Sequence, residues 1–283
     1  MADPLIYDAL MALGGVGGTA AGAWGFLVEP RMVKERQVRI ETMRWPGHVG
    51  ELRVAVLGDF QVGAPWFKLK HLDRVVDRVN ALQPDAVVLL GDYVIEGVLF
   101  GRFVEPSGIA RSLSRLNARY GVYSVLGNHD WWHDGEEIRR ELEGAGIVVL
   151  ENQSVPVDTP AGRFWIAGLA DESTRSPCVA TTFGPIPEDE PVIALVHDPV
   201  TFFGIPERAA ITFAGHTHGG QFRLPFVGTP YSVGGTPRRM AYGLIREGGK
   251  DLYVTSGLGT SAVPARFNMP PEFALVTLAA APT

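Results

Sequence analysis

Two histidines separated by one residue, His216 and His218, are the clearest candidates for chemistry in this 283-residue sequence. They follow the apolar run 209–213, so they are predicted to lie at the mouth of a buried strand. In an extended segment, residues two apart point to the same side, and both rings can therefore address one small volume. Neutral imidazole is the commonest metal ligand among side chains, which predicts a metal site here. Taken alone, the pair is equally consistent with two histidines in a loop.

Four further apolar segments also end in side chains that can bind metal or carry a proton. A single Gly-Asp after a strand is usually a turn, but turn formation does not explain five polar strand ends in one chain. In α/β sheets, sites are built at the carboxyl ends of strands because the loops converge there. We therefore expect these residues to share one site with the two histidines: Asp59, Asp92, Asn128 with His129, and His197.

The elements that must position these residues alternate between strand and helix patterns, which predicts an α/β core. Along 69–82, apolar residues recur at helical spacing, and His71 lies off that stripe as an expected surface residue. Further helices are predicted around 109–116 and over 136–143. Strands are predicted over 38–43, 52–57, 86–90, 120–126, 147–150, 163–169, 191–196 and 209–213, with short strands near 252–255 and 273–278.

Composition limits the class of protein. The chain is 46% hydrophobic and 20% charged, as expected of a globular domain, and its net charge of -6 argues against a general nucleic-acid binder. Cys178 is the only cysteine, so the chain has neither an intramolecular disulfide nor a cluster of thiolate ligands. We expect Cys178 to be an incidental thiol.

The N-terminal segment 9–28 carries no charged residue over a length that can cross a bilayer core. It is followed by Arg31 and Lys34, and an excess of positive charge after a span holds the following domain in the cytoplasm. We therefore divide the chain into a hydrophobic helix or membrane anchor, residues 1–30, and a main domain, residues 31–283. This predicts association with the inner membrane and a cytoplasmic main domain. The alternative is a helix docked on a soluble cytoplasmic protein.

From about Arg53 to the C-terminus, the polar strand ends together resemble the calcineurin-like metallophosphoesterases. The residues that carry the resemblance are Asp59-x-Gln61, Gly91-Asp92, Gly127-Asn128-His129-Asp130, His197 and Gly215-His216-Thr217-His218. The chain is most similar to the bacterial branch that has an N-terminal hydrophobic segment and Gly-Gly-Gln after the last histidine. The resemblance implies a four-layer αββα sandwich, in which two mixed β-sheets pack face to face between helices. It also implies an active catalytic domain over residues 31–283.

The resemblance implies two divalent metal ions that share one carboxylate. Mixed oxygen and nitrogen ligands without a thiolate suit Mn most of all, with Fe, Zn or Mg as alternatives. Such a pair lowers the pKa of a bridging water to give hydroxide for in-line attack on phosphorus. By motif position, one ion would be held by Asp59, Gln61, His218 and the bridging Asp92, and the other by Asp92, Asn128, His197 and His216.

By the same resemblance, His129 protonates the departing oxygen as a general acid, and Asp130 orients its ring. Gln61 departs from the family, because most members have histidine at this position. An amide oxygen is a weaker ligand for zinc than imidazole. The first metal position is therefore expected to bind more weakly, with a shift toward Mn or Mg.

Arg238 and Arg239 are expected to contact the substrate, because arginine can bind a phosphate through two parallel hydrogen bonds. The alternative is a solvated pair without a ligand. Trp131 and Trp132 either line the leaving-group pocket or cap the core. The resulting prediction is a membrane-associated phosphodiesterase or pyrophosphatase for a lipid-linked or cell-envelope phosphoester. A phosphomonoesterase is the alternative enzyme. An inactive scaffold with this fold, favoured only by Gln61, is the alternative of another class.

Overall fold

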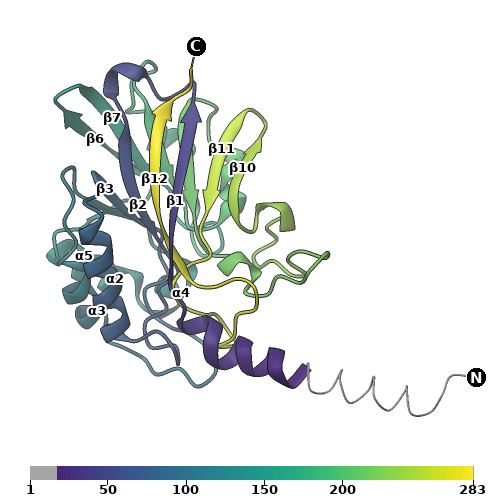
Figure 1. Cartoon of the computed structure of the whole chain (residues 1–283). Helices are drawn as coiled ribbons and strands as arrows, with labels where there is room; N and C mark the ends of the chain where they lie inside the picture. Colours follow the sequence, from purple (N-terminus) through teal and green to yellow (C-terminus); the bar gives the residue numbers. More distant parts are fainter. Residues whose placement is uncertain (1–17, 283) are drawn as a thin grey trace, which may run out of the picture.

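Two six-stranded β-sheets packed face to face form the centre of the structure, a computed structural model that describes residues 18–282 (Figure 1). The side chains between them form a continuous apolar core, to which the first sheet contributes Val54 and Val88 and the second contributes Ile193 and Phe213. Helices cover the outer faces. The expected four-layer αββα sandwich is therefore confirmed.

The first sheet has the strand order β1-β12-β2-β3-β4-β5, and β2 to β5 run parallel to one another. The strand β12 is antiparallel to β2 and parallel to β1. The bounds are β1 (Lys34–Thr42), β2 (Leu52–Leu57), β3 (Ala86–Leu89), β4 (Val122–Ser124), β5 (Val148–Val149) and β12 (Glu272–Ala280).

The uninterrupted apolar sequence of β2 follows from its burial on both faces. Successive side chains of a strand point to opposite sides. Val54 and Val56 accordingly lie in the core between the sheets, whereas Ala55 and Leu57 pack in a second core beneath the helices. Those helices are α2 (Leu69–Ala81), α3 (Pro106–Leu113) and α5 (Gly135–Gly144).

The second sheet has the strand order β10-β11-β9-β8-β7-β6, with β7, β8, β9 and β11 parallel and the two edge strands antiparallel to their neighbours. On its outer face, Ala167 and Val192 pack with Phe183 and Phe202 of the covering segments. The bounds are β6 (Gln153–Thr159), β7 (Gly162–Gly168), β8 (Val192–Leu195), β9 (Ala209–Ala214), β10 (Gly243–Glu247), β11 (Lys250–Val254), α6 (Val179–Phe183) and η4 (Pro199–Gly204).

The sequence patterns identified the central strands and missed the edges of the second sheet. The strands β6 and β10 are mostly exposed or half-buried, so they lack the apolar run that marks a buried strand. The short helix α4 (Asn128–His133) was also not expected, because the motif that contains it reads as a loop.

The N-terminal segment is helical over 18–23 and continues through η1 (Trp24–Val28) and η2 (Glu29–Arg31) into β1. Glu29 joins it to the domain, because its carboxylate accepts the backbone N–H of Asn268 at 2.9 Å and of Met269 at 2.5 Å. Within residues 18–282, no helix is both long and apolar enough to cross a membrane. Residues 9–17 of the expected apolar segment 9–28 lie outside the described part of the chain.

Candidate metal centre

The seven residues expected to bind metal all follow parallel strands, at the carboxyl ends of β2, β3, β4, β8 and β9. Two hydrogen bonds join the loops of the two sheets. The carboxylate Oδ1 of Asp59 accepts the backbone N–H of His216 at 2.7 Å, and Nδ1 of His197 donates to the carbonyl of Leu90 at 2.6 Å. The edge of the double sheet therefore brings together residues from distant parts of the sequence.

Five of these seven residues have a left-handed backbone conformation. Positive φ is uncommon for residues other than glycine and is retained where the surrounding structure enforces it, often at functional sites. The five residues and their φ angles are Asp59 (49°), Gln61 (40°), Asp92 (58°), His216 (68°) and His218 (51°). The strained backbone is thus concentrated at the expected ligands.

The side chains form two overlapping groups that share Asp92. In the first group, one ligand atom from each of Asp59, Asp92 and His218 lies within 4.8 Å of the others. In the second group, the same holds for Asp92, His197 and His216. Each group contains three members of one ligand set implied by the resemblance.

The two amide side chains lie beside these groups. Asn128 Oδ1 is 3.1 Å from Nε2 of His197, and Gln61 Nε2 is 3.4 Å from Oδ2 of Asp92. The loop between β4 and α4 passes close to Asp92 at Gly127, where an added Cβ would lie 2.3 Å from Oδ1 of Asp92. Only glycine leaves room there for the shared carboxylate.

Several buried polar atoms of the cluster lack hydrogen-bond partners among the described residues, which indicates whether the cluster is suited to divalent cations. Buried polar atoms are normally hydrogen-bonded, yet four ligand atoms of the cluster have no hydrogen-bond partner within residues 18–282. Oxygen and nitrogen lone pairs of this kind are the ligands that Mn, Fe, Zn and Mg accept. The donor set therefore fits metal ions. The four atoms are Asp59 Oδ2, Gln61 Oε1, His216 Nε2 and His218 Nε2.

The electrostatics of the cluster also favour added positive charge. Burial raises the pKa of the Asp59 carboxyl to about 7. Burial also opposes charge on His197, but the neighbouring Asp92 carboxylate raises the pKa of this imidazole well above its usual value. Burial and Arg266 lower the pKa of His218. The carboxyl groups of Asp59 and Asp92 are thus buried close together, and bound cations would stabilise both of them in the ionised form.

His197 is held by a residue outside the ligand set, and His216 lies next to another such residue. Nδ1 of His197 donates to the carbonyl of Leu90, which fixes the ring so that Nε2 faces Asp92 and Asn128 and is the nitrogen that could bind a metal ion. Asp198 is a residue that the sequence reasoning did not assign to the site. Its Oδ2 lies 3.6 Å from Nε2 of His216. Its place directly after His197 was the signal that could have identified it.

Arg266 is a second residue that the sequence reasoning missed. Its fully buried guanidinium donates to the carbonyls of Gly259, Ser256 and Met269 at 2.6, 2.7 and 3.1 Å, and lies 3.5 Å from Nδ1 of His218. Burial lowers its pKa to about 10. It therefore holds together the loops next to His218. No motif in the sequence marks it.

His129 lies at the cluster with its ring near the shared carboxylate. Its backbone N–H donates to Oδ1 of Asp92 at 3.0 Å, and its Nε2 lies 4.0 Å from Oδ2 of the same residue. The backbone N–H of Glu96 donates to Nδ1 at 3.2 Å. A ring that accepts at Nδ1 carries its proton on Nε2, so the second nitrogen can donate.

Asp130 was predicted to orient the His129 ring, but its hydrogen bonds within residues 18–282 go to other groups. Its two carboxylate oxygens instead accept backbone N–H groups of Asp92 at 2.8 Å, Tyr93 at 2.7 Å and Gly127 at 2.9 Å. An ionised carboxylate can satisfy several donors at once, and these loops expose buried amides that need an acceptor. Asp130 therefore holds the loop that carries Asp92 and the loop that precedes α4.

A cavity of about 240 Å³ opens on the cluster. Trp132 lines it, 59% exposed, with its ring 4.7 Å from that of His129. Trp131 instead packs against Arg175, whose guanidinium carbon lies 3.5 Å from the centroid of the Trp131 ring. The cavity is lined by Asp92, Asn128, His129, Trp132, Ser173, His216, His218, Val233, Gly234 and Ser261.

The expected substrate arginines do not line this cavity. Arg238 and Arg239 line a different one, of about 290 Å³. Nε and Nη2 of Arg239 donate to the carboxylate of Glu247 at 2.9 and 2.6 Å. Arg238 and Arg239 are both exposed. The structure therefore brings the predicted metal ligands and His129 together without these two arginines.

Comparisons with known proteins agree with this geometry. The family described as Calcineurin-like phosphoesterase matches residues 52–220. The phosphodiesterase YaeI of Escherichia coli is 33% identical over 203 residues, which cover 69% of this chain and 71% of that protein. An uncharacterized metallophosphoesterase of Bacillus subtilis, YkuE, is 28% identical over 265 residues, which cover 92% and 91%. Among solved structures, a 5'-nucleotidase precursor from Thermus thermophilus is similar at 16% identity and a TM-score of 0.47, over 72% of this chain and 48% of that chain.

The family match covers more than half of the chain and includes every strand end that contributes to the cluster. The buried donor set is one that can hold divalent metal ions. The chain therefore belongs to the calcineurin-like phosphoesterase family and is a metal-dependent hydrolase of phosphoester bonds.

Proposed function

We propose that this protein is a membrane-associated phosphodiesterase or pyrophosphatase with a dinuclear metal centre, in which Asp92 serves both ions. The observation that carries the proposal is the pair of side-chain groups that share Asp92 and contain unpartnered ligand atoms. Mn is the preferred ion, and Gln61 supplies a neutral oxygen where an imidazole would favour zinc. One ion is assigned to Asp59, Gln61, Asp92 and His218, and the other to Asp92, Asn128, His197 and His216.

Two divalent ions supply an activated water and neutralise charge on the phosphoryl oxygens. The remaining chemistry belongs to the chain itself. His129 lines the cavity and has its Nδ1 occupied by the N–H of Glu96, so Nε2 can donate its proton to the departing oxygen. Trp132 beside it offers an apolar wall for the leaving group. Asp130 positions the backbone around His129 rather than its ring.

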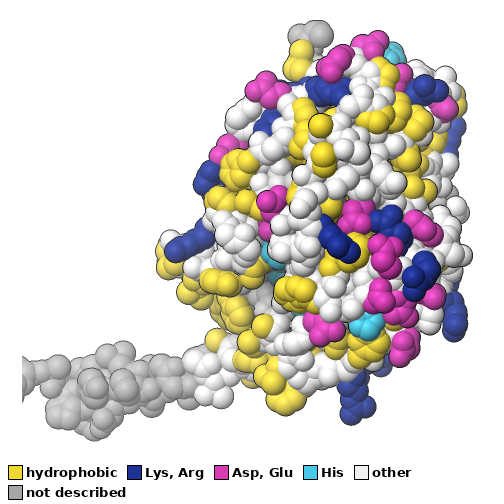
Figure 2. Space-filling view, turned by 180° about the vertical axis from the view of Figure 1, so that it is seen from behind, with side chains coloured by type: hydrophobic (Ala, Val, Ile, Leu, Met, Phe, Trp, Pro, Cys, Tyr) yellow, Lys and Arg dark blue, Asp and Glu magenta, His cyan; other side chains and the backbone are white. Residues whose placement is uncertain are grey.

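An apolar surface near the N-terminal segment supports the membrane part of the proposal. Trp24 is 45% exposed and Phe226 is fully exposed. Trp24 and Pro225 line one cavity, so the N-terminal segment and the loop around Phe226 are neighbours. Hydrophobic side chains gather at the end of the domain from which the N-terminal segment emerges (Figure 2). Such a surface suits a lipid bilayer and a lipid-linked or cell-envelope phosphoester.

Hydrolysis of bis-p-nitrophenyl phosphate tests the reaction. Metal-stripped protein should be inactive and should regain activity with Mn, whereas His129→Ala should lose about 10²–10⁴-fold in kcat while still binding metal. Turnover of p-nitrophenyl phosphate but not of the diester would instead indicate the phosphomonoesterase. Full activity of His129→Ala would refute the assignment of the proton donor.

A further inference from the structure

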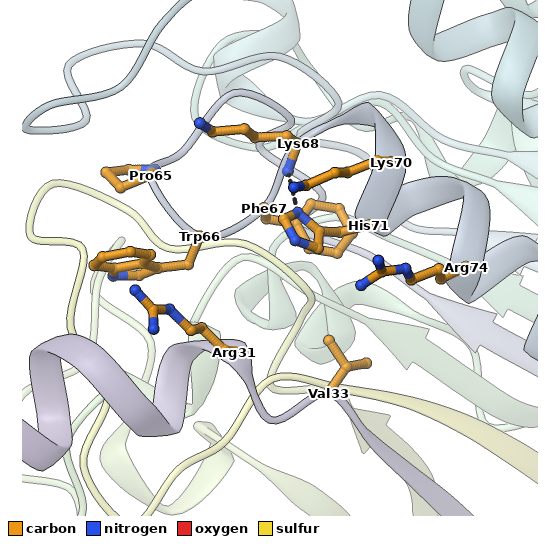
Figure 3. A pocket seen from close by; sticks show the side chains of 9 residues that line it. All are labelled: Arg31, Val33, Pro65, Trp66, Phe67, Lys68, Lys70, His71 and Arg74. Carbon is orange, nitrogen blue, oxygen red and sulfur yellow. Dashed lines mark hydrogen bonds between the residues drawn. The ribbon is translucent and has the colours of Figure 1, made fainter.

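Another cavity, of about 420 Å³, lies between the N-terminal segment and the beginning of α2 (Figure 3). We call it the basic cavity. It shares no lining residue with the cavity at the metal ligands. Four of its nine lining residues are lysine or arginine, although the chain as a whole has a net charge of -6. The lining residues are Arg31, Val33, Pro65, Trp66, Phe67, Lys68, Lys70, His71 and Arg74.

The charge of the basic cavity is not compensated. Within residues 18–282, none of its four cations forms an ion pair. The nearest acids along the same elements are engaged elsewhere. Glu29 accepts hydrogen bonds from Asn268 and Met269, and Asp73 and Asp77 of α2 pair with Arg115. The cavity therefore keeps a positive potential that an anion can neutralise.

One wall of the cavity is held in place by contacts that do not involve a ligand. The indole N–H of Trp66 donates to the carbonyl of Pro264 at 3.0 Å. The guanidinium of Arg31 stacks on the Trp66 ring, 3.9 Å from its centroid. Figure 3 shows Arg31 and Trp66 facing Lys68 and Lys70 across the cavity. Among residues 18–282, no acceptor forms a hydrogen bond with the guanidinium of Arg31, so its planar donors can bind a ligand.

His71 and the beginning of α2 provide further donors. His71 is half-buried in this cavity, although the sequence suggested a simple surface residue. Its Nδ1 accepts the backbone N–H of Lys68 at 3.0 Å, so the neutral ring carries its proton on Nε2. Burial, then Lys70, Arg74, Lys68 and Arg31, lower the pKa of His71. The first turn of α2 contains no acidic residue, and a helix N-terminus favours anions.

We propose that the basic cavity binds a phosphate group, as a second phosphate site apart from the metal centre. Arginine, lysine and a neutral imidazole N–H around one cavity are the donors that a tetrahedral oxyanion accepts. The phosphate is carried by an anionic lipid headgroup or by a soluble phosphate compound. Arg31 follows the exposed apolar residues of η1 by three positions, which places the cavity beside the surface proposed to meet a membrane. The site does not depend on the proposed reaction.

The test compares the full-length protein with two double variants of equal charge change. Lys70→Glu with Arg74→Glu removes the cavity's charge, and acidic residues near the start of a helix are compatible with folding. Arg111→Glu with Arg140→Glu is the matched control, on exposed arginines of α3 and α5 that form no ion pair in the described structure. Hydrolysis of the soluble diester is measured on all three proteins and should be unchanged, so a failure of the proposed reaction remains separate.

Two measurements identify the source of the phosphate. In the first, the imidazole resonance of His71, assigned with His71→Gln, is followed in metal-stripped protein as inorganic pyrophosphate is added. A bound anion should raise the pKa of His71 in the wild type and in the control pair only. In the second, flotation is measured with phosphatidylcholine vesicles with and without phosphatidylglycerol. The cavity pair should bind the anionic vesicles at least about thirtyfold less than the wild type, because the loss of two cations near an anionic surface alone accounts for that factor and the two added carboxylates are repelled.

A response to pyrophosphate alone would identify a soluble phosphate as the ligand. A response to anionic vesicles alone would identify a lipid headgroup. Equal losses in the cavity pair and the control pair would mean that net charge attracts the anion, and would overturn the proposal. The absence of any response of wild-type His71 and of any preference for anionic vesicles would overturn it as well.

Discussion

Replacing Asp130 with asparagine tests whether this carboxylate holds the loops or acts on His129. At present, Oδ2 accepts from the backbone N–H groups of Asp92 and Gly127, and Oδ1 accepts from Tyr93. Asparagine has one carbonyl oxygen. If that oxygen takes the place of Oδ2, the amide group faces the N–H of Tyr93, a donor that now lies 2.7 Å from Oδ1.

The expected loss of stability in Asp130→Asn follows from this change of hydrogen-bond partners. One charge-assisted hydrogen bond is lost, and one fully buried N–H is left without an acceptor. Together these should lower the free energy of unfolding by about 2–4 kcal/mol. For a domain of this size, that corresponds to a fall in Tm of roughly 5–10 °C.

Thermal unfolding of the metal-stripped protein, followed by circular dichroism, measures this effect directly. Asp134→Asn is the matched control, because Asp134 caps α5 by accepting the N–H of Glu137 at 2.9 Å. Asparagine is about as good an N-cap as aspartate, so Tm should change by about 1 °C or less. An unchanged Tm in Asp130→Asn, together with a large fall in kcat, would refute this reasoning and restore the role of orienting His129.

Three further predictions concern the metal centre. Adding Mn to about 100 times its Kd should raise the free energy of unfolding by about 2.7 kcal/mol, seen as a rise in Tm that EDTA reverses, and an unchanged Tm would contradict the metal assignment. Gln61→His should lower the free zinc concentration that gives half-maximal activity, because imidazole is the stronger zinc ligand; an unchanged value would remove Gln61 from the ligand set. Gly234→Ala would place a Cβ 2.6 Å from Nε2 of His216 and 2.7 Å from Oδ2 of Asp198, so activity and metal affinity should both fall. Gly235→Ala has the same kind of positive φ but nothing within 4 Å of the added Cβ, and an equal loss of activity in it would indicate backbone strain instead.

Periodicity was sufficient to predict the central strands, and the polar residues at their ends are the ones that the structure brings together. The run at β2 is apolar on both faces because it is buried between the other sheet and the helices, and such runs stand out in a sequence. The strands β6 and β10 lie at sheet edges and bury little, so their sequences resemble loops. The local sequence pattern reflects burial, so it does not identify a strand that is only slightly buried.

The roles of Asp130, Asp198 and Arg266 depended on the tertiary structure. Each interacts with groups contributed by other loops. The carboxylate of Asp130 reaches amides 37 and 38 residues away in the chain, and the guanidinium of Arg266 lies 48 residues from His218. A polar side chain binds whichever unsatisfied group is brought within about 3 Å, and sequence spacing does not reveal that group.

For the basic cavity, too, the sequence shows which residues are present, and only the tertiary structure shows which of them interact. The sequence contains Arg31 and three cations between residues 68 and 74, but it does not show that Trp66 lies under Arg31 or that the nearby acids are paired elsewhere. The sequence by itself determined the α/β fold and which strands end in polar side chains, because burial leaves periodic patterns in the chain. The tertiary structure decided which polar groups interact, because hydrogen bonds and ion pairs act only over a few ångströms in space.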